Sequence, residues 1–170
     1  MALYHFSVRH VSRGKGQMVV ASAAYISGQR IFDSYYNKIH DYTSKSGVIF
    51  TEILTPEYVP ERLTDRETLW NEVEHVERNN KAQLAYSFDI ALQNELTLEE
   101  NIRLAKEFCQ EQFVARGMIV DLAVHEGKSD NEEEPDNPHF HVLAPIRPFT
   151  EEGIWGNKQR REYILDEDGN

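Results

Sequence analysis

Residues 137–143 read NPHFHVL, and the stretch HFHVLAPI that continues to residue 146 has the apolar character of a buried strand. Side chains alternate across a strand, so His139 and His141 share one face while Phe140 and Val142 take the other. An imidazole is costly to bury without a polar partner. Two of them on one face of a core strand therefore call for an explanation.

A second candidate strand, MIVDLAVH at 118–125, supplies a third histidine. Strand alternation separates two sets of side chains, an apolar set (Met118, Val120, Leu122, Val124) and an opposite set (Ile119, Asp121, Ala123, His125). If 118–125 and 139–146 pair as a hairpin, His125 joins the face of His139 and His141. The alternative reading is that the two histidines are exposed or simply hydrogen-bonded.

Three converging imidazoles with open coordination positions are typical of a catalytic divalent-metal site, whereas closed structural sites usually take four ligands. Asp121, or Asp89 on the polar face of the candidate strand 82–92, would then be a carboxylate able to accept an imidazole N–H. The hairpin therefore predicts a metal centre, because strand alternation places the three histidines on one face.

The remaining pattern predicts an α+β fold in a single domain covering residues 1–170. Capping boxes at Thr64/Glu67 and Thr97/Glu100 mark two helices, and a third, rich in small residues, ends near Gly28. Hairpin-linked strands with helices gathered on one face favour an antiparallel sheet over a doubly wound one. The candidate strands are 3–11, 48–54, 82–92, 118–125 and 139–146. The final YILDEDGN resembles a strand entering a turn, which predicts a fragment of a longer protein.

Composition excludes several classes of protein. The net charge is −11, which argues against general nucleic-acid binding, yet residues 1–45 carry six Lys or Arg against two acidic residues. The positive N-terminal segment permits a local anionic ligand. No apolar run approaches the ~18 residues of a membrane span, and the N-terminus is not a signal peptide, so no membrane insertion is expected. The single Cys109 excludes a disulfide framework and is expected to be buried, in keeping with a reducing cytoplasm.

Five segments together resemble the MobA/MobL family of plasmid-mobilisation relaxases, the MobQ type. They occur in the family's order from residue 3 to about residue 165: YHFSVRHVSRGKGQ, ASAAYISG, HDYTSKSGVIFTEIL, LWNEVEHVE and GMIVDLAVHEG…NPHFHVLAPIRPF. The resemblance implies a His-hydrophobic-His endonuclease fold with helices on one face of the sheet and the metal on the other. It also implies cutting of one DNA strand at an origin of transfer, through a 5′-phosphotyrosyl intermediate, in the bacterial cytoplasm.

The nucleophile implied by the resemblance is Tyr25, in SAAYISG, with Tyr42 as the next candidate. Small neighbours such as Ala21, Ser22 and Gly28 leave room for a phosphodiester beside the phenol. A phenol with a pKa near ~10 is a weak nucleophile at neutral pH until its proton is withdrawn or the developing charge is stabilised.

The implied metal triad is His125, His139 and His141, holding a divalent ion against a phosphate oxygen. Manganese or magnesium is the expected ion, and zinc would also bind histidines tightly. Relatives commonly carry an Arg-Glu pair where this chain has Tyr86-Ser87, so a carboxylate expected near the site is missing. Asp89, on the same face, matches an acidic position and is a candidate proton acceptor or histidine-orienting group.

The implied partner is single-stranded plasmid DNA at the origin of transfer, with other relaxosome or coupling proteins. The candidate DNA contacts are basic or aromatic side chains in loops: Arg9, Arg13, Lys15, Tyr42, Lys45, Lys158, Arg160 and Arg161. Tyr35 and Tyr36 offer further stacking surfaces. Two alternatives remain: a rolling-circle replication initiator, which usually carries its tyrosine after the histidines, and a non-catalytic origin-binding module, which the loss of the carboxylate at Ser87 would permit.

Overall fold

The computed structural model describes residues 4–131 and 136–158. Within these ranges seven strands form two sheets, with bounds β1 (Phe6–Ser12), β2 (Arg30–Asp33), β3 (Lys38–Asp41), β4 (Val48–Leu54), β5 (Gln83–Ala91), β6 (Val120–His125) and β7 (His139–Pro145). The main sheet is antiparallel throughout and has the order β1-β5-β7-β6-β4, while β2 and β3 form a separate hairpin. The helices are α1 (Val19–Ser27), α2 (Arg66–Val76) and α3 (Leu98–Gln112), with short 3-10 turns at Arg13–Lys15, Glu61–Thr64 and Val114–Arg116. The predicted α+β class and antiparallel sheet are confirmed.

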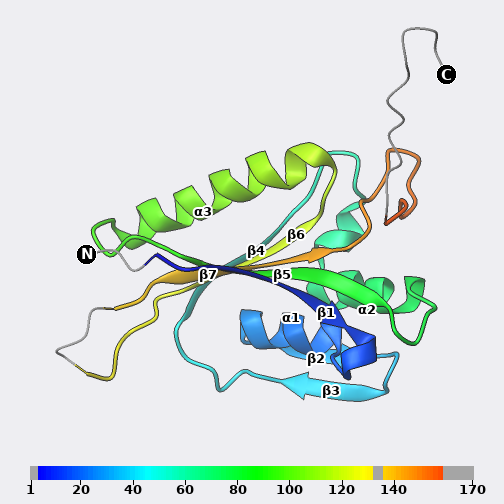
Figure 1. Ribbon diagram of the computed structural model, residues 1–170, viewed down its shortest axis with the longest axis horizontal. Helices are drawn as coiled ribbons and strands as arrows, with labels where there is room; N and C mark the ends of the chain where they lie inside the picture. Colours follow the sequence, from blue (N-terminus) through cyan, green and yellow to red (C-terminus); the bar gives the residue numbers. More distant parts are fainter. Residues whose placement is uncertain (1–3, 132–135, 159–170) are drawn as a thin grey trace, which may run out of the picture.

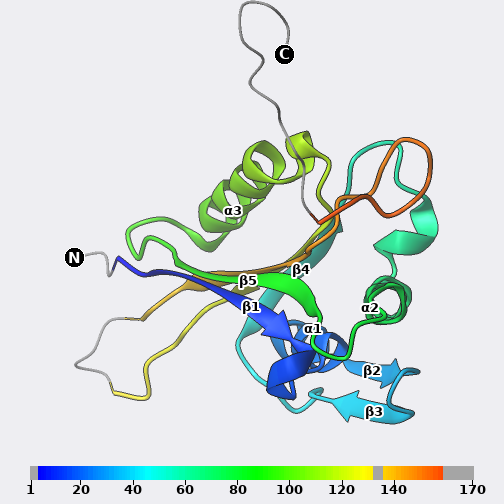
Figure 2. The ribbon, with the colours of Figure 1, turned by 45° about the vertical axis from the view of Figure 1, so that its right-hand side comes forward.

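The helices cover both faces of the sheet, which corrects the prediction that they gather on one. Figure 1 shows α3 on one side of the sheet and α1, α2 and the β2–β3 hairpin on the other, and Figure 2 shows the same layers after a 45° turn. Two apolar clusters fill the layers. The α3 cluster contains Val120, Leu122 and Val124, and the α1/α2 cluster contains Ala123 and Leu143. Consequently the three histidines lie on the same face as α1 and α2.

Strand β6 explains why both faces need cover. All of its residues are buried, including Asp121, which has no exposed surface. A buried carboxylate must be paired, and α2 supplies Arg66 and Trp70 as its donors, each at 2.8 Å from the Asp121 carboxylate. The helix is therefore attached to the sheet by the one charged side chain in β6.

Local capping sets the helix ends. Thr97 and Glu100 form the predicted capping box of α3, in which each side chain accepts the other residue's backbone N–H. The cap of α2 lies one residue later than predicted: Asp65 accepts from the Thr68 N–H at 2.8 Å, whereas the Thr64 hydroxyl donates to the Glu61 carbonyl. The preceding 3-10 turn occupies Thr64, so the helix begins after it.

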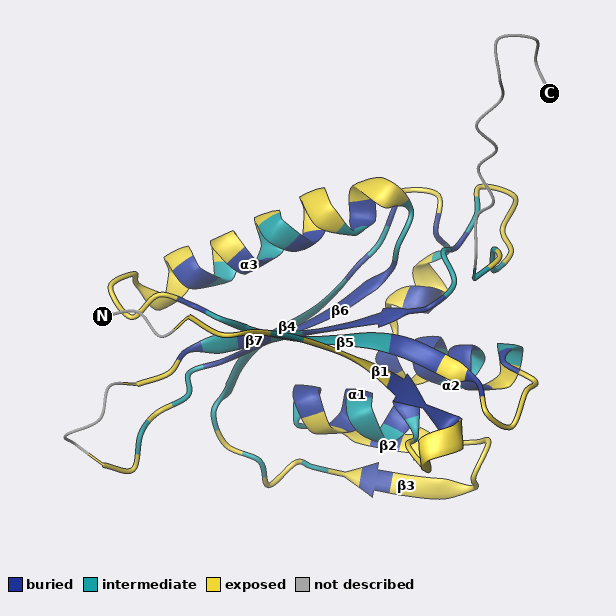
Figure 3. Cartoon of the chain, viewed as in Figure 1, coloured by how far each residue is buried: buried dark blue, intermediate teal, exposed yellow. Residues whose placement is uncertain are grey.

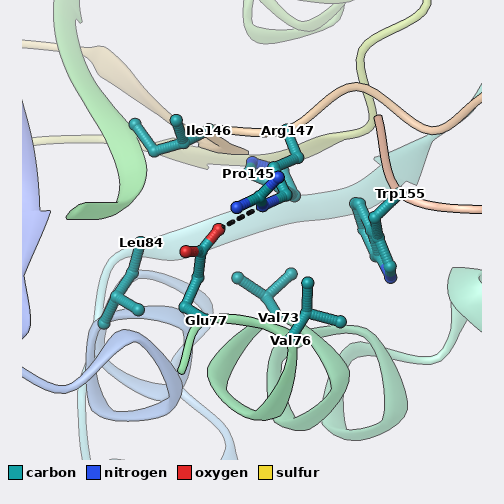
Figure 4. Close-up of a pocket in the computed structure, with 8 residues that line it drawn as sticks. All are labelled: Val73, Val76, Glu77, Leu84, Pro145, Ile146, Arg147 and Trp155. Atoms are coloured by element: carbon teal, nitrogen blue, oxygen red, sulfur yellow. Dashed lines mark hydrogen bonds and ion pairs between the residues drawn. The ribbon is translucent and has the colours of Figure 1, made fainter. Parts of the chain in front are cut away.

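The chain after β7 turns back onto α2. Glu77, just beyond the end of α2, is ion-paired with Arg147 at 2.6 Å and with Lys158 at 2.7 Å. Figure 4 shows the Arg147–Glu77 pair beside Leu84 and the α2 side chains Val73 and Val76. These contacts fix the segment after β7 to the α2 side of the molecule. The predicted strand YILDEDGN lies outside the described residues.

Helix α3 is an amphipathic cover on its face of the sheet. Its outer surface is exposed and its inner side buried (Figure 3). Cys109 lies on the buried side, where desolvation raises the pKa of its thiol to about 12, so the thiol is protonated and acts as a small apolar side chain, as predicted. No helix among the described residues has the length and apolar character to cross a membrane.

Candidate active site

Three imidazole rings meet at one end of the β6–β7 pair. His125, the last residue of β6, lies directly opposite His139, the first residue of β7, and His141 follows on the same face. One ligand nitrogen from each ring lies within 4.8 Å of the other two. The ring centroids are separated by 5.2 Å (His125–His139), 4.6 Å (His125–His141) and 5.0 Å (His139–His141). The convergence predicted from strand parity is confirmed.

Backbone carbonyls fix the tautomers of two rings. His125 Nε2 lies 2.7 Å from the carbonyl oxygen of Ile26, and His139 Nδ1 lies 2.8 Å from that of Asn137. A carbonyl only accepts, so each of these nitrogens carries a hydrogen, and in the neutral tautomer the other ring nitrogen carries the lone pair that a metal needs. Orientation of this kind is what metal-binding histidines usually receive from neighbouring groups.

Desolvation favours the neutral form of two of the three rings, His125 and His141. Desolvation lowers the pKa of His141 to about 4, although the nearby Asp89 opposes the shift. Desolvation also lowers the pKa of His125, against the hydrogen bond to Ile26. Because a metal binds the neutral imidazole, these two rings are ready to act as ligands at neutral pH without losing a proton. The donor set therefore fits a divalent cation.

Tyr25 faces solvent from the last turn of α1. Its side chain is 51% exposed, and its ring meets that of Tyr42 edge-on at 5.3 Å. Helix α1 ends at Gly28, whose left-handed backbone (φ 63°) and close approach to Val48 leave little room for a side chain. The helix therefore stops directly after presenting the phenol.

An open groove of about 440 Å³ joins Tyr25 to the triad. Both Tyr25 and His141 line it, and its walls include the small residues Ala21 and Ser22 expected to leave room beside the phenol. Ser87, opposite Leu143 on the triad face, also lines the groove. Helix α1 is connected to the triad through His125, which donates to the residue after Tyr25. The phenol of Tyr25 and the imidazole of His141 thus line one groove on one face of the sheet.

The two candidate carboxylates differ in what they contact. Asp89 in β5 lies directly opposite His141 in β7 in the strand register. It also lines a second, smaller pocket of about 170 Å³ together with His5 and His139. Both oxygens of Asp121 are instead taken up by α2. This corrects the prediction that Asp121 orients an imidazole, and Asp89 is the remaining candidate.

The basic residues fall into two groups. Arg9 lines the groove and is exposed, as is Lys15. Arg13 is buried and ion-paired with Glu74 at 2.7 Å, which corrects its assignment as a DNA contact. The Lys158 ammonium donates to the Gln83 carbonyl at 2.9 Å and is ion-paired with Glu77. Arg160 and Arg161 lie outside the described residues.

The aromatic candidates also separate. Tyr42 is half-buried against the α1/α2 cluster and supports the Tyr25 ring. Tyr35 and Tyr36 are exposed at the turn between β2 and β3, in edge-on contact at 4.9 Å, with the Arg13 guanidinium 4.4 Å from the centre of the Tyr35 ring. The hairpin thus carries an exposed aromatic pair on a fixed base.

Sequence reasoning missed two elements of the site. The first is the Ile26 carbonyl, a backbone group that no residue pattern marks. The second is the position of Lys45, whose ammonium donates to the Tyr25 carbonyl at 3.0 Å and lies 3.6 Å from the centre of the Tyr25 ring. Lys45 was identified by its charge alone, and its contact with the nucleophile candidate spans 20 residues.

Comparison with known proteins gives a consistent set of relatives. Residues 17–170 match the model of the MobA/MobL family. The conjugal transfer protein TraA of Agrobacterium fabrum is 37% identical over 99% of this chain and 15% of its own length. The probable mobilization protein MobA of Bifidobacterium longum is 34% identical over 99% of this chain and 29% of its own length. The chain thus spans well under half of these relatives.

A solved structure has the same architecture. It is described as "Molecular Basis of Vancomycin Resistance Transfer in Staphylococcus aureus" and superimposes with a TM-score of 0.83 at 38% sequence identity, covering 97% of this chain and 81% of the other. Sequence and fold therefore agree, and the chain belongs to the MobA/MobL family.

Proposed function

We propose that this domain is a DNA relaxase, which nicks one strand of plasmid DNA at an origin of transfer and holds the cut end covalently on Tyr25. The observation that carries the proposal is the groove that Tyr25 shares with His141, in a chain whose relatives are named conjugal transfer and mobilization proteins. The groove is open to solvent, as access for a DNA strand requires.

The reaction is a transesterification. The Tyr25 phenol loses its proton, its oxygen attacks the scissile phosphorus, and the bond from phosphorus to the 3′ oxygen breaks. The product is a 5′-phosphotyrosyl link, and the released oxygen takes up a proton to become a 3′-hydroxyl. The reverse attack rejoins the strand, so hydrolysis of the link must be avoided.

His125, His139 and His141 would hold a divalent metal ion. Bound there, the ion would polarise the scissile phosphate and offset the negative charge that develops on its oxygens. The fit rests on the mutual distance of the three donors and the two tautomers fixed by backbone carbonyls. Manganese suits histidine ligands better than magnesium does, and zinc would bind the same donors.

We assign Asp89 one of two roles. It accepts the proton that the Tyr25 phenol loses, or it orients the His141 ring. It lies on the triad face and acts electrostatically on both His125 and His141. Ser87 lines the groove at the position where the family resemblance leads us to expect a glutamate. Arg9 and Lys15 would contact the DNA backbone, and Tyr35 and Tyr36 would stack on bases. Relaxosome or coupling proteins would be the further partners.

The missing carboxylate favours one alternative, a non-catalytic domain that binds the origin without cutting it. A labelled single-stranded oligonucleotide set that tiles the origin region separates the two functions. We expect a covalent protein–DNA product from the wild type with Mn²⁺, its loss on addition of EDTA, and no product from Tyr25→Phe. Tyr42→Phe, a matched loss of one hydroxyl in the ring beside it, should still form the product.

Covalent product from Tyr25→Phe would show that another residue is the nucleophile. Metal-independent binding without any covalent product, in the wild type and across the whole set, would favour the binding module.

A further inference from the structure

The last turn of α1 is held by side chains from outside the helix. The final carbonyls of a helix have no partner within it. Here the Tyr25 carbonyl accepts from Lys45 Nζ at 3.0 Å, and the Ile26 carbonyl accepts from His125 Nε2 at 2.7 Å. The peptide groups of the tyrosine and of its neighbour are therefore fixed separately, one by a lysine and the other by a member of the triad.

Lys45 also contacts the Tyr25 ring. Its ammonium lies 3.6 Å from the ring centre, while the Tyr42 ring meets Tyr25 edge-on at 5.3 Å. The face of an aromatic ring attracts a cation, more strongly where water is partly excluded. The ring is thus held at two points, by Tyr42 and Lys45, which belong to one short loop.

That loop is itself braced. The Asp41 carboxylate accepts from the Thr43 N–H at 3.0 Å and from the Thr43 hydroxyl at 2.7 Å. Tyr42 N–H donates to the Gln29 carbonyl at 3.2 Å, and Lys45 N–H donates to the Tyr42 carbonyl at 3.0 Å. The loop is therefore attached to the end of α1, and Lys45 is presented from a turn rather than from a free surface.

We propose that Lys45 is a positioning residue for Tyr25, which holds the phenol toward the groove and balances the negative charge that the phenol gains when its proton leaves. This inference rests on the proposed function, because it takes Tyr25 as the nucleophile. Lys45 keeps its own protons throughout. The Lys45 ammonium already makes two contacts, a hydrogen bond to the Tyr25 carbonyl and a cation–π contact with the Tyr25 ring.

The competing role for Lys45 is a simple DNA phosphate contact. Such a lysine contributes to the affinity for DNA, and its charge acts at the backbone rather than on the tyrosine. A positioning lysine contributes to the rate of the chemical step after DNA has bound. Affinity and single-turnover rate therefore separate the two roles.

The experiment compares Lys45→Met, Lys45→Arg and the matched control Lys81→Met, which removes an exposed lysine from the turn before β5. Each protein is tested with a tiling oligonucleotide that gives covalent product with the wild type. We expect Lys45→Met to lower the single-turnover rate of product formation by about 10-fold or more, with DNA affinity within about twofold of the wild type. Lys45→Arg should restore most of the rate because it keeps the cation, and Lys81→Met should leave both quantities unchanged.

A loss of affinity in Lys45→Met that equals its loss of rate would overturn the inference in favour of a phosphate contact. An unchanged rate in Lys45→Met, or a Lys45→Arg protein as slow as Lys45→Met, would overturn it as well. Thermal unfolding and Mn²⁺ binding are measured on all variants, and a slow Lys45→Met protein that has also lost stability or metal affinity counts against a specific role. If the wild type forms no product, or Tyr25→Phe still does, the proposed function itself fails, which is a distinct result.

Discussion

The two faces of the central sheet are built from the same strands but hold different chemistry. On the α3 face, β6 and β7 contribute Val120, Leu122, Val124, Phe140 and Val142, all packed in one apolar cluster. On the other face the same strands contribute Asp121, His125, His139 and His141 together with small or aliphatic residues. Because the two sets alternate along each strand, one face stabilises the backbone that positions the other face. Changes on the two faces should therefore separate stability from function.

The largest expected effect comes from removing a ring of the triad. We expect His141→Ala to lower the single-turnover rate of covalent product formation by about 1000-fold, since several kcal/mol of charge stabilisation are lost with the ion. Mn²⁺ titration by calorimetry should show a matching loss of affinity. Val142→Ala, the next residue on the opposite face, is the control and should bind Mn²⁺ as the wild type does. Equal metal affinity in His141→Ala and the wild type would refute the metal centre.

The next effect concerns the attachment of α2. Asp121→Asn leaves the buried Arg66 guanidinium without its counter-charge, so we expect unfolding to become easier by about 3 kcal/mol. Chemical denaturation measures the loss. If Asp121 orients an imidazole after all, Mn²⁺ affinity will fall as well, and that outcome would reverse the correction made above.

On the apolar face, Leu122→Ala removes a fully buried side chain from the α3 cluster. The cavity and the lost burial should reduce the free energy of unfolding by about 2–3 kcal/mol. Mn²⁺ affinity measured at a temperature where the variant is folded should stay at the wild-type value. A variant that loses metal affinity without losing stability would contradict the division between the two faces.

A further contrast is pH dependence. The unfolded chain takes up protons on its histidines near pH 6.5, whereas the folded His141 does so only near pH 4, and the pKa of His125 is also lowered. The metal-free protein should therefore keep this part of its stability above pH 6.5 and lose it as the pH falls toward 4. Chemical denaturation across that range, compared with His141→Gln, measures the effect. The same pH slope in both proteins would mean that the pKa of His141 is not lowered in the folded protein.

The smallest expected effect lies at the start of α3. Thr97→Ala removes the capping oxygen that the Glu100 N–H uses, for a loss of about 1 kcal/mol in the free energy of unfolding. Product formation and metal affinity should not change. Thr64→Ala, at the site where a cap was predicted and is not found, is a useful comparison because it should cost less.

Local rules predicted the centre of the site, and longer-range contacts accounted for what was missed. Strand alternation depends only on neighbouring residues, so the common face of His125, His139 and His141 could be read directly. The burial and ion pairing of Arg13 could not be predicted in this way, because its partner Glu74 lies 61 residues away in the sequence. The same holds for Asp121, which is paired with Arg66 across 55 residues. Strand alternation predicts which side chains share a face, but it does not predict which helix covers that face.

A backbone hydrogen bond links the two ends of the connection between β6 and β7. Asn137 N–H donates to the Gly127 carbonyl at 2.8 Å, and any side chain carbon at position 127 would meet the Asn137 carbonyl oxygen at 1.9 Å. Beyond this constriction, insertions and deletions need not disturb the opposition of His125 and His139. The length of this connection can therefore change while His125 and His139 stay opposite each other. A search for related proteins that demands a fixed gap between the first histidine and the His-x-His pair would overlook members with a longer or shorter connection.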